Sequence, residues 1–412
     1  MKQTTTRWHK QLATAVILLF GVTLSHAQST CAPGDASRAA LLPLALQYKL
    51  LAHKFTGDDA ELDAPPDVSR DVVMLRKTLD VATQAFFRCE AGDDSNPASL
   101  QQKLSAFLHT DQSKRNNNGN AVDGIYGANL QIQIIPAKAF PNSLFVVLNF
   151  GIECGDDNLL FLYTQEDGQW RQRLHWYSDK YTKPSDAFGD IFFYDAVPGP
   201  TEVQPLVAVV HGHPWCTSGY SDFDLDLLQP ATATSSQLHL DHAADGYIRT
   251  FDTRFSRTAN GLELRVHVAS RDSDLIFQPG ILRYSTNTGK FILLPVALNA
   301  RDFVNQWLEE PWSTVAGWSA TPGQNLQNTH NRFDYSLHKD GDDIPGVTFG
   351  AVRSCTSAPN HFQIEIDLTD SKSNSIPPLY AQIRQNPGSF TMLAVTPKAD
   401  PTCTGINLMP KH

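Results

Sequence analysis

Two stretches of the chain, LFVVLNFGIEC at residues 144–154 and LVAVVHGHPWC at residues 206–216, resemble each other. Each contains an apolar run followed by a glycine and ends in a cysteine, and Cys154 aligns with Cys216 without a gap. A period of about sixty residues is close to that of known repeat architectures. The pair therefore predicts two copies of one β unit that lie next to each other in space.

A second pattern extends the repeat toward the C-terminus. The stretches LYTQEDGQW (162–170), RYSTNTGKF (283–291) and QIRQNPGSF (382–390) share a glycine that is followed two residues later by an aromatic residue. Glycine-containing turns of this kind connect the strands of hairpins. From residue 121 onward, short runs rich in β-branched and aromatic residues alternate with turn residues, which is typical of strands. Two of these runs are IFFYDAV (191–197) and LELRVHVA (262–269).

The fold class follows from these patterns. We expect a mainly β protein with an N-terminal helical subdomain, antiparallel-sheet repeats that are propeller-like or sandwich-like, and a short helical insert before the last β unit. A propeller normally needs at least four blades. The sequence patterns support three repeat units and give weaker support to a fourth. The propeller-like and the sandwich-like arrangement therefore both remain open.

Helical periodicity occurs at two places. From Ser69, a predicted N-cap, one apolar stripe recurs at steps of three and four, and it comprises Val72, Leu75, Leu79, Ala82 and Phe86. We expect a helical subdomain over 28–112, a β-repeat domain over 121–300, and a C-terminal unit over 301–412. The last unit begins with a helix that ends before Pro311.

The segment 1–27 has the layout of a secretory signal peptide. Lys2, Arg7 and Lys10 precede an apolar run at 12–24, and Ser25-His26-Ala27 provides a small-x-small cleavage site. Cleavage would change the formal net charge from −10 to −13, because it removes three basic residues and no acidic one. We expect a secreted or periplasmic protein without an integral membrane segment in the mature chain. A chain with this net negative charge does not suit binding to the phosphate backbone of nucleic acids, and we predict no nucleic-acid partner.

Six cysteines in an exported chain indicate disulfides. No CxxC pair occurs, which argues against a zinc ribbon or a thioredoxin-like site. The repeat register pairs Cys154 with Cys216, and pairing within the flanking units completes the set. The predicted disulfides are Cys31–Cys89, Cys154–Cys216 and Cys355–Cys403.

Residues 211–226 contain candidate metal ligands. His211 and His213 share one face of a predicted strand, and imidazole is a common ligand of zinc and copper. Asp222, Asp224 and Asp226 alternate with apolar residues, and carboxylates suit calcium. We take His211, His213 and Asp222 as candidate ligands, with zinc and calcium as candidate ions and no cofactor favoured. The alternative is that the two histidines lie at a strand end and hydrogen-bond to backbone groups, and that the three aspartates lie on the solvent-facing side of a strand. Aspartates about 7 Å apart on a straight strand do not converge easily on one ion.

Four aromatic residues form a candidate ligand-binding set. Trp176, Tyr177, Tyr181 and Trp215 could stack on sugar rings or anchor a protein partner if they are exposed on one rim. The alternative is that most of them belong to the core. The predicted partners are a glycan or an envelope protein.

Familiar catalytic signatures do not occur in the sequence. It contains no GxSxG, HExxH, GxxxxGK or GxGxxG motif. We therefore expect an exported, non-catalytic binding or interaction protein. Two alternatives remain: a secreted hydrolase that uses His211, His213 and nearby aspartates, with or without a metal, and a purely structural envelope protein.

Overall fold

The computed structural model describes residues 31, 35–52, 64–110, 126–152, 155–183, 186, 192–199, 205–213, 219–244, 246–249, 253–272, 275–295, 299–334, 337–338 and 344–409. The predicted signal peptide, Cys154, Cys216 and Trp215 lie outside the described residues.

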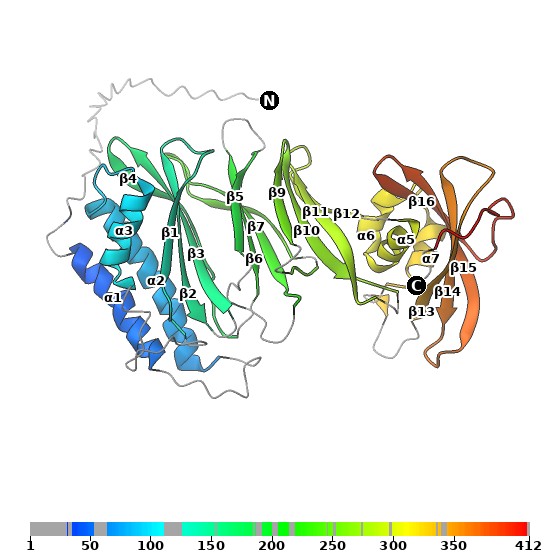
Figure 1. The fold of residues 1–412 in the computed structure, drawn as a ribbon, viewed down its shortest axis with the longest axis horizontal. Coiled ribbons are helices and arrows are strands. Elements are labelled where there is room, and N and C mark those ends of the chain that lie inside the picture. Colours follow the sequence, from blue (N-terminus) through cyan, green and yellow to red (C-terminus); the bar gives the residue numbers. More distant parts are fainter. Residues whose placement is uncertain are drawn as a thin grey trace, which may run out of the picture.

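Four antiparallel sheets and two groups of helices follow one another as layers (Figure 1). Each sheet has four strands in sequence order, so that every sheet is an up-and-down meander. The mainly β class with an N-terminal helical region and antiparallel-sheet repeats is confirmed. Within the described part of the chain, the sheets do not close into a barrel or a propeller. The first three sheets pack face to face in a row, and helices separate the third sheet from the fourth (Figure 1). The sheets therefore do not surround a common axis as the blades of a propeller do, which excludes the propeller among the two predicted architectures.

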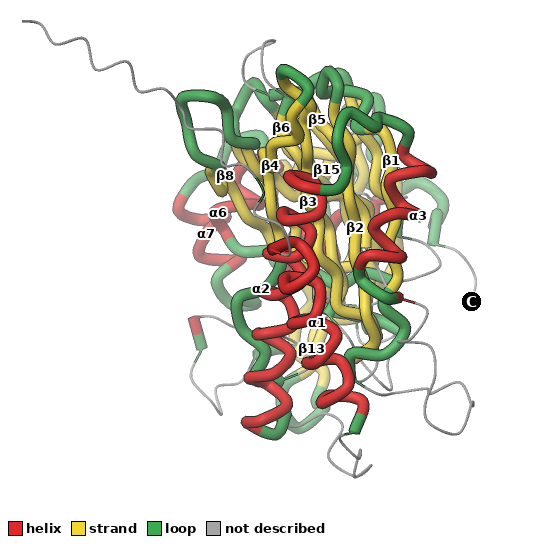
Figure 2. The backbone as a smooth tube through the Cα atoms, turned by 90° about the vertical axis from the view of Figure 1, so that its left-hand side faces the viewer, coloured by secondary structure: helices red, strands yellow, loops and turns green. Residues whose placement is uncertain are grey.

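The first layer is helical. It contains α1 (Asp35–Leu51), α2 (Pro66–Cys89) and α3 (Pro97–Phe107), and these helices cover the outer face of the first sheet (Figures 1 and 2). The predicted stripe of α2 is buried. The predicted N-cap Ser69 is wrong, because the helix begins earlier: Pro65 occupies the N-cap position, without a side-chain hydrogen bond, and Pro66 is the first helical residue. Proline suits the first turn because the amide hydrogens there have no partner within the helix. None of the described helices is both long and apolar enough to cross a membrane.

Sheets 1 and 2 pack face to face. Sheet 1 consists of β1 (Gln131–Pro136), β2 (Ser143–Ile152), β3 (Gly155–Glu166) and β4 (Gln169–Trp176). Sheet 2 consists of β5 (Phe192–Val197), β6 (Leu206–Gly212), β7 (Phe223–Gln229) and β8 (Leu238–Ala243). Val207 and Val209 of β6 share a core with Val147 of β2, whereas Ala208 and Val210 face sheet 3. Because β6 is buried on both faces, its apolar run is continuous instead of alternating.

The remaining layers are sheet 3, a second group of helices, and sheet 4. Sheet 3 consists of β9 (Arg254–Thr258), β10 (Gly261–Ala269), β11 (Phe277–Ser285) and β12 (Lys290–Pro295). The helices are α5 (Ala300–Glu309), α6 (Trp312–Val315), the 3₁₀ helix η2 (Ala316–Trp318) and α7 (Gln324–His330). Sheet 4 consists of β13 (Gly346–Ser354), β14 (His361–Thr369), β15 (Ser375–Asn386) and β16 (Ser389–Thr396). The helix predicted before Pro311 is therefore present as α5.

The repeats predicted from the sequence are present as equivalent parts of the sheets. Leu144 and Leu206 lie in β2 and β6, the second strand of sheets 1 and 2. The three glycine-containing stretches are the hairpins between the third and fourth strands of sheets 1, 3 and 4. The disulfides Cys31–Cys89 and Cys355–Cys403 form as predicted. The Cys154–Cys216 pair stays a prediction, because both residues are outside the described part.

Candidate metal centre

Three neighbouring strands of sheet 2 place imidazole and carboxylate groups on one face. His211 of β6 lies directly opposite Asp224 of β7, and Asp226 of β7 lies directly opposite His242 of β8. Val207 and Val209 precede His211 on the same face, where they pack against sheet 1. The polar groups therefore lie at the end of a hydrophobic space between two sheets.

A β-bulge in β8 adds a further histidine to this face. His242 pairs with Asp226, but the register then shifts by one residue, so that His239 pairs with Leu228 and Leu240 is skipped. Side chains alternate between the faces of a regular strand, so residues three apart would point to opposite sides. An extra residue in one strand changes this alternation. The bulge is the reason that His239 and His242 both point to the face that carries Asp226.

The first group of candidate ligands comprises His211, His213 and Asp224. The Nε2 atom of His213 lies 2.8 Å from Oδ2 of Asp224, and Nε2 of His211 lies 3.6 Å from the same oxygen. One ligand atom from each of the three residues lies within 4.8 Å of the other two. This group is close to the geometry in which a single ion could bind all three.

The second group comprises Asp226, His239 and His242, and its ligand atoms also lie within 4.8 Å of one another. Oδ1 of Asp226 lies 2.9 Å from Nε2 of His239 and 3.0 Å from Nδ1 of His242. The other nitrogen of His242 lies 3.3 Å from Oδ1 of Asp224. The imidazole of His242 thus connects the two groups.

Burial and neighbouring polar groups together determine the charges of His211 and Asp224 in the first group. It lowers the pKa of His211 to about 3, although Asp224 and Asp226 oppose this shift. The ring is therefore neutral at neutral pH, which is the form that binds metals. Burial alone would raise the pKa of Asp224, but the hydrogen bond from His213 and the neighbouring imidazoles outweigh it and lower the pKa below its usual value. Asp224 is an anion over the physiological range.

Sheet 1 contributes an orienting contact from the opposite side. Trp176, at the end of β4, donates a 2.7 Å hydrogen bond from Nε1 to Oδ2 of Asp226. Its ring also packs against His211, with the ring centres 4.8 Å apart, and stacks on Phe192. A ligating carboxylate is commonly held by a second hydrogen bond of this kind.

The two groups open into a cleft with a volume of about 920 Å³. Six of its lining residues belong to the described positions 177–183 and 186, which follow β4 and are here called the wall segment. This wall segment contributes two lysines, Lys180 and Lys183, and two aspartates, Asp179 and Asp186. Besides the six candidate ligands, the cleft is lined by Trp176, Tyr177, Ser178, Asp179, Lys180, Lys183, Asp186 and Asp222.

Arg76 of helix α2 binds backbone carbonyl groups of the wall segment. Its side chain is completely buried and forms a 2.6 Å ion pair with the equally buried Asp157 of β3. The guanidinium group also donates from Nη1 to the carbonyl oxygens of Ser178 (2.7 Å) and Lys180, and from Nη2 to that of Asp186 (3.4 Å). One residue of the helical layer thereby fixes three backbone positions beside the candidate centre.

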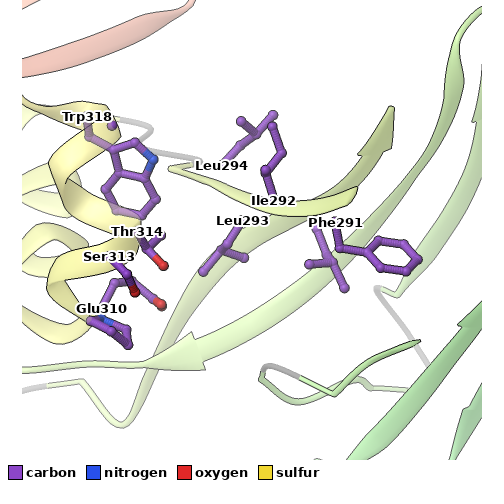
Figure 3. A pocket seen from close by; sticks show the side chains of 11 residues that line it. Phe291, Ile292, Leu293, Leu294, Glu310, Ser313, Thr314 and Trp318 are labelled. Atoms are coloured by element: carbon purple, nitrogen blue, oxygen red, sulfur yellow. The ribbon is translucent and has the colours of Figure 1, made fainter. Parts of the chain in front are cut away.

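Another cavity, with a volume of about 530 Å³, lies between sheet 3 and the helices that follow it (Figure 3). Its described lining is mostly apolar and includes Leu294 on β12 and Trp318 of η2, and Glu310 is the one ionisable residue in that lining. These lining residues offer no set of metal ligands or catalytic groups. The cleft on sheet 2 is therefore the stronger candidate site.

The structure brings together some of the predicted site residues and separates others. His211 and His213 lie in the first group as proposed, but Asp224 completes it in place of Asp222. Asp222 is exposed in the same cleft just before β7, where its carbonyl oxygen accepts a hydrogen bond from the amide of His213. Trp176 and Tyr177 line the cleft.

Tyr181 does not have the predicted exposed position. It is 1% exposed and packs edge-on against Tyr126 in the core beneath the helices, so its place does not support contact with a ligand. Tyr181 is therefore a core residue, which was the predicted alternative to a role in ligand binding. Trp215 lies outside the described residues.

His239 and His242 were missed by sequence reasoning. A signal was present, because the repeat requires a fourth strand after β7, and LHLD at 238–241, just before His242, alternates apolar and polar residues. That alternation alone would have placed the two histidines on opposite faces. The bulge that unites them is visible only in the strand pairing.

Comparison with known proteins adds little. No protein-family model matches the chain, and no curated protein matches it. One solved structure, described as an "Ntf2 like protein involved in plasmid conjugation", aligns with 80% of this chain and 100% of its own, at 13% sequence identity and a TM-score of 0.13. A TM-score this low supports no conclusion about the fold or function of this chain.

Proposed function

We propose that the protein is an exported metal-binding protein that holds a divalent transition ion, zinc above all, on sheet 2. One observation carries the proposal: His211, His213 and Asp224 present ligand atoms within 4.8 Å of one another at the floor of a cleft. Zinc accepts imidazole nitrogen and carboxylate oxygen at about 2.0–2.2 Å, usually with four ligands.

The donor types favour zinc over calcium. Calcium takes six to eight oxygen ligands. The two groups supply four imidazoles and only two carboxylates, Asp224 and Asp226. Imidazole suits zinc, copper, iron and nickel, which makes a transition ion the better match.

Export is part of the same proposal. The apolar run at 12–24 supports a cleaved signal peptide, and the two disulfides of the structure are compatible with an oxidising compartment. A glycan or an envelope protein remains a proposed partner at the cleft rim. Tyr177, which is half-buried there, is the aromatic residue that best supports it.

Elemental analysis and titration test the proposal. The mature full-length protein, purified without chelator, is expected to contain stoichiometric zinc and to recover it after stripping. The double variant His211→Ala/His213→Ala should lower zinc affinity by more than about a hundredfold, because even partners outside the ligand set cost about ten- to a hundredfold. His175→Ala is the matched control, since His175 is exposed on β4 and does not line the cleft. Weak zinc binding by the wild type, or a number of bound ions and an affinity that are both unchanged in the double variant, would reject the proposal.

A metal-assisted hydrolase is a second candidate, favoured by the number of ligands. Catalytic zinc sites have three protein ligands and keep one position for water or substrate. The first group has three ligands and faces a cleft large enough for a small substrate. A panel of carboxylic ester, phosphoester and peptide substrates tests this candidate. Turnover that requires zinc and is lost in Asp224→Asn supports it, and absence of turnover in the zinc-loaded protein counts against it.

A further inference from the structure

We infer that the centre on sheet 2 takes two divalent ions, one in each group of ligands. This inference rests on the proposed metal-binding function and extends it. The first ion would be held by His211, His213 and Asp224. The second would be held by Asp226, His239 and His242.

The number of donors exceeds the need of one ion. A tetrahedral zinc ion uses four ligands, whereas sheet 2 offers four imidazoles and two carboxylates on one face. These six donors divide into two complete sets of three. Each set leaves one position for water, for substrate or for a ligand shared between the ions.

The outer histidines show that the cluster is too long for a single ion. His213 contacts the carboxylate of Asp224, and His239 contacts the carboxylate of Asp226. Asp224 and Asp226 are two positions apart on one strand, a distance of about 7 Å along β7. An ion with bonds of about 2 Å cannot reach both outer histidines without a large rearrangement. Two ions can, one at each carboxylate.

The central imidazoles connect the two positions. Nε2 of His211 lies 3.6 Å from Asp224 and 3.9 Å from Asp226, and His242 has one nitrogen near each of these carboxylates. A histidine ligand usually binds the metal through one nitrogen and donates from the other to a carboxylate. His242 can therefore ligate the second ion while it donates to the ligand of the first.

The charge of the cleft accommodates a second ion. Five aspartates and two lysines line it, a formal charge of −3 with neutral imidazoles. One divalent ion leaves −1 and a second changes this to +1. The second ion thus does not create a large uncompensated charge in a half-buried site.

Counting bound ions tests the inference. The stripped full-length protein is titrated with Co²⁺, with visible absorbance and elemental analysis after gel filtration as the measurements. We expect two equivalents for wild type and for the control His175→Ala, and one equivalent each for His213→Ala and His239→Ala. Circular dichroism verifies that the variants are folded.

The outcomes separate this inference from the proposed function. A wild-type protein that binds one equivalent overturns the two-ion centre and leaves metal binding intact, whereas one that binds none overturns both. Two equivalents retained in both single variants overturn the assignment of ligands. If a variant does not fold, the break point of the wild-type titration still decides between one ion and two.

Discussion

Replacement of Arg76 by methionine tests whether the helical layer supports the candidate centre. Methionine keeps most of the side-chain volume of the buried arginine but removes the guanidinium group. The ion pair with Asp157 and the hydrogen bonds to the wall segment are lost together. We expect two effects, on stability and on metal affinity.

The stability effect follows from the burial of both partners, which are each 0% exposed. Breaking a buried ion pair by removing one partner costs about 3–5 kcal/mol, because an uncompensated charge stays behind. Replacing both partners by apolar residues of similar size is often neutral. Arg76→Met should therefore cost about 4 kcal/mol, and Arg76→Met/Asp157→Leu should recover most of it.

The pH dependence has a defined sign. Burial raises the pKa of Asp157 above its usual value while Arg76 opposes the shift, so loss of Arg76 raises the pKa further. A group whose pKa is higher in the folded chain than in the unfolded chain favours folding in acid, and this contribution is lost as pH rises through the folded pKa. The stability difference between Arg76→Met and wild type should be smaller at about pH 5 than at about pH 8.

Urea denaturation followed by tryptophan fluorescence measures stability, and zinc titration measures the second effect. Zinc affinity should fall about tenfold as the wall segment moves, the lower end of the range for supporting groups. Arg70→Met is the matched control on the same helix: Arg70 is 63% exposed on its side chain and lies 3.5 Å from Asp71. It should cost less than about 1 kcal/mol. A cost below about 1 kcal/mol for Arg76→Met would refute the stabilising role inferred for Arg76 beside the buried Asp157.

Three further changes have simple expected outcomes. Cys355→Ser/Cys403→Ser opens the loop that this disulfide closes. It should lower stability by about 4 kcal/mol in the chain-entropy account, measured by urea denaturation against the oxidised wild type. Trp176→Phe keeps an aromatic ring but removes the hydrogen bond to Asp226. We expect a lower urea midpoint, because a buried carboxylate oxygen loses its donor, and a zinc affinity about tenfold lower by calorimetry. Asn299→Ala removes the side-chain cap of α5. It should cost about 1 kcal/mol in the same denaturation assay, and an unchanged midpoint would show that the cap is not stabilising.

Much of the fold could be predicted because its signals are local. The stripe of α2, the apolar run of β6 and the glycine-containing hairpins each depend on residues close together in the sequence. The disulfides Cys31–Cys89 and Cys355–Cys403 followed from pairing within a unit. The N-cap of α2 was misplaced because a serine and a proline pair both suit a helix start, and here the proline begins the helix.

The candidate centre was only partly visible in the sequence. His211 and His213 are two positions apart, so a regular strand places them on one face whatever the rest of the chain does. The choice of Asp224 over Asp222 depends on which residue of β7 pairs with His211 across the sheet. That pairing depends on how β7 is aligned with β6, which is set by the burial of their apolar side chains against the neighbouring sheets and not by the spacing of polar residues within one strand.

By itself, the sequence determined the strands, the repeat, two of the disulfides and the histidine pair, because these depend on periodicity and on contacts within one unit. The tertiary structure alone decided that the first three sheets pack face to face, that a bulge turns His239 toward Asp226, and that Trp176 reaches across from sheet 1. The physical reason is that register, bulges and packing between sheets are set by partners far away in the chain, whose contacts leave no periodic signal in either segment alone.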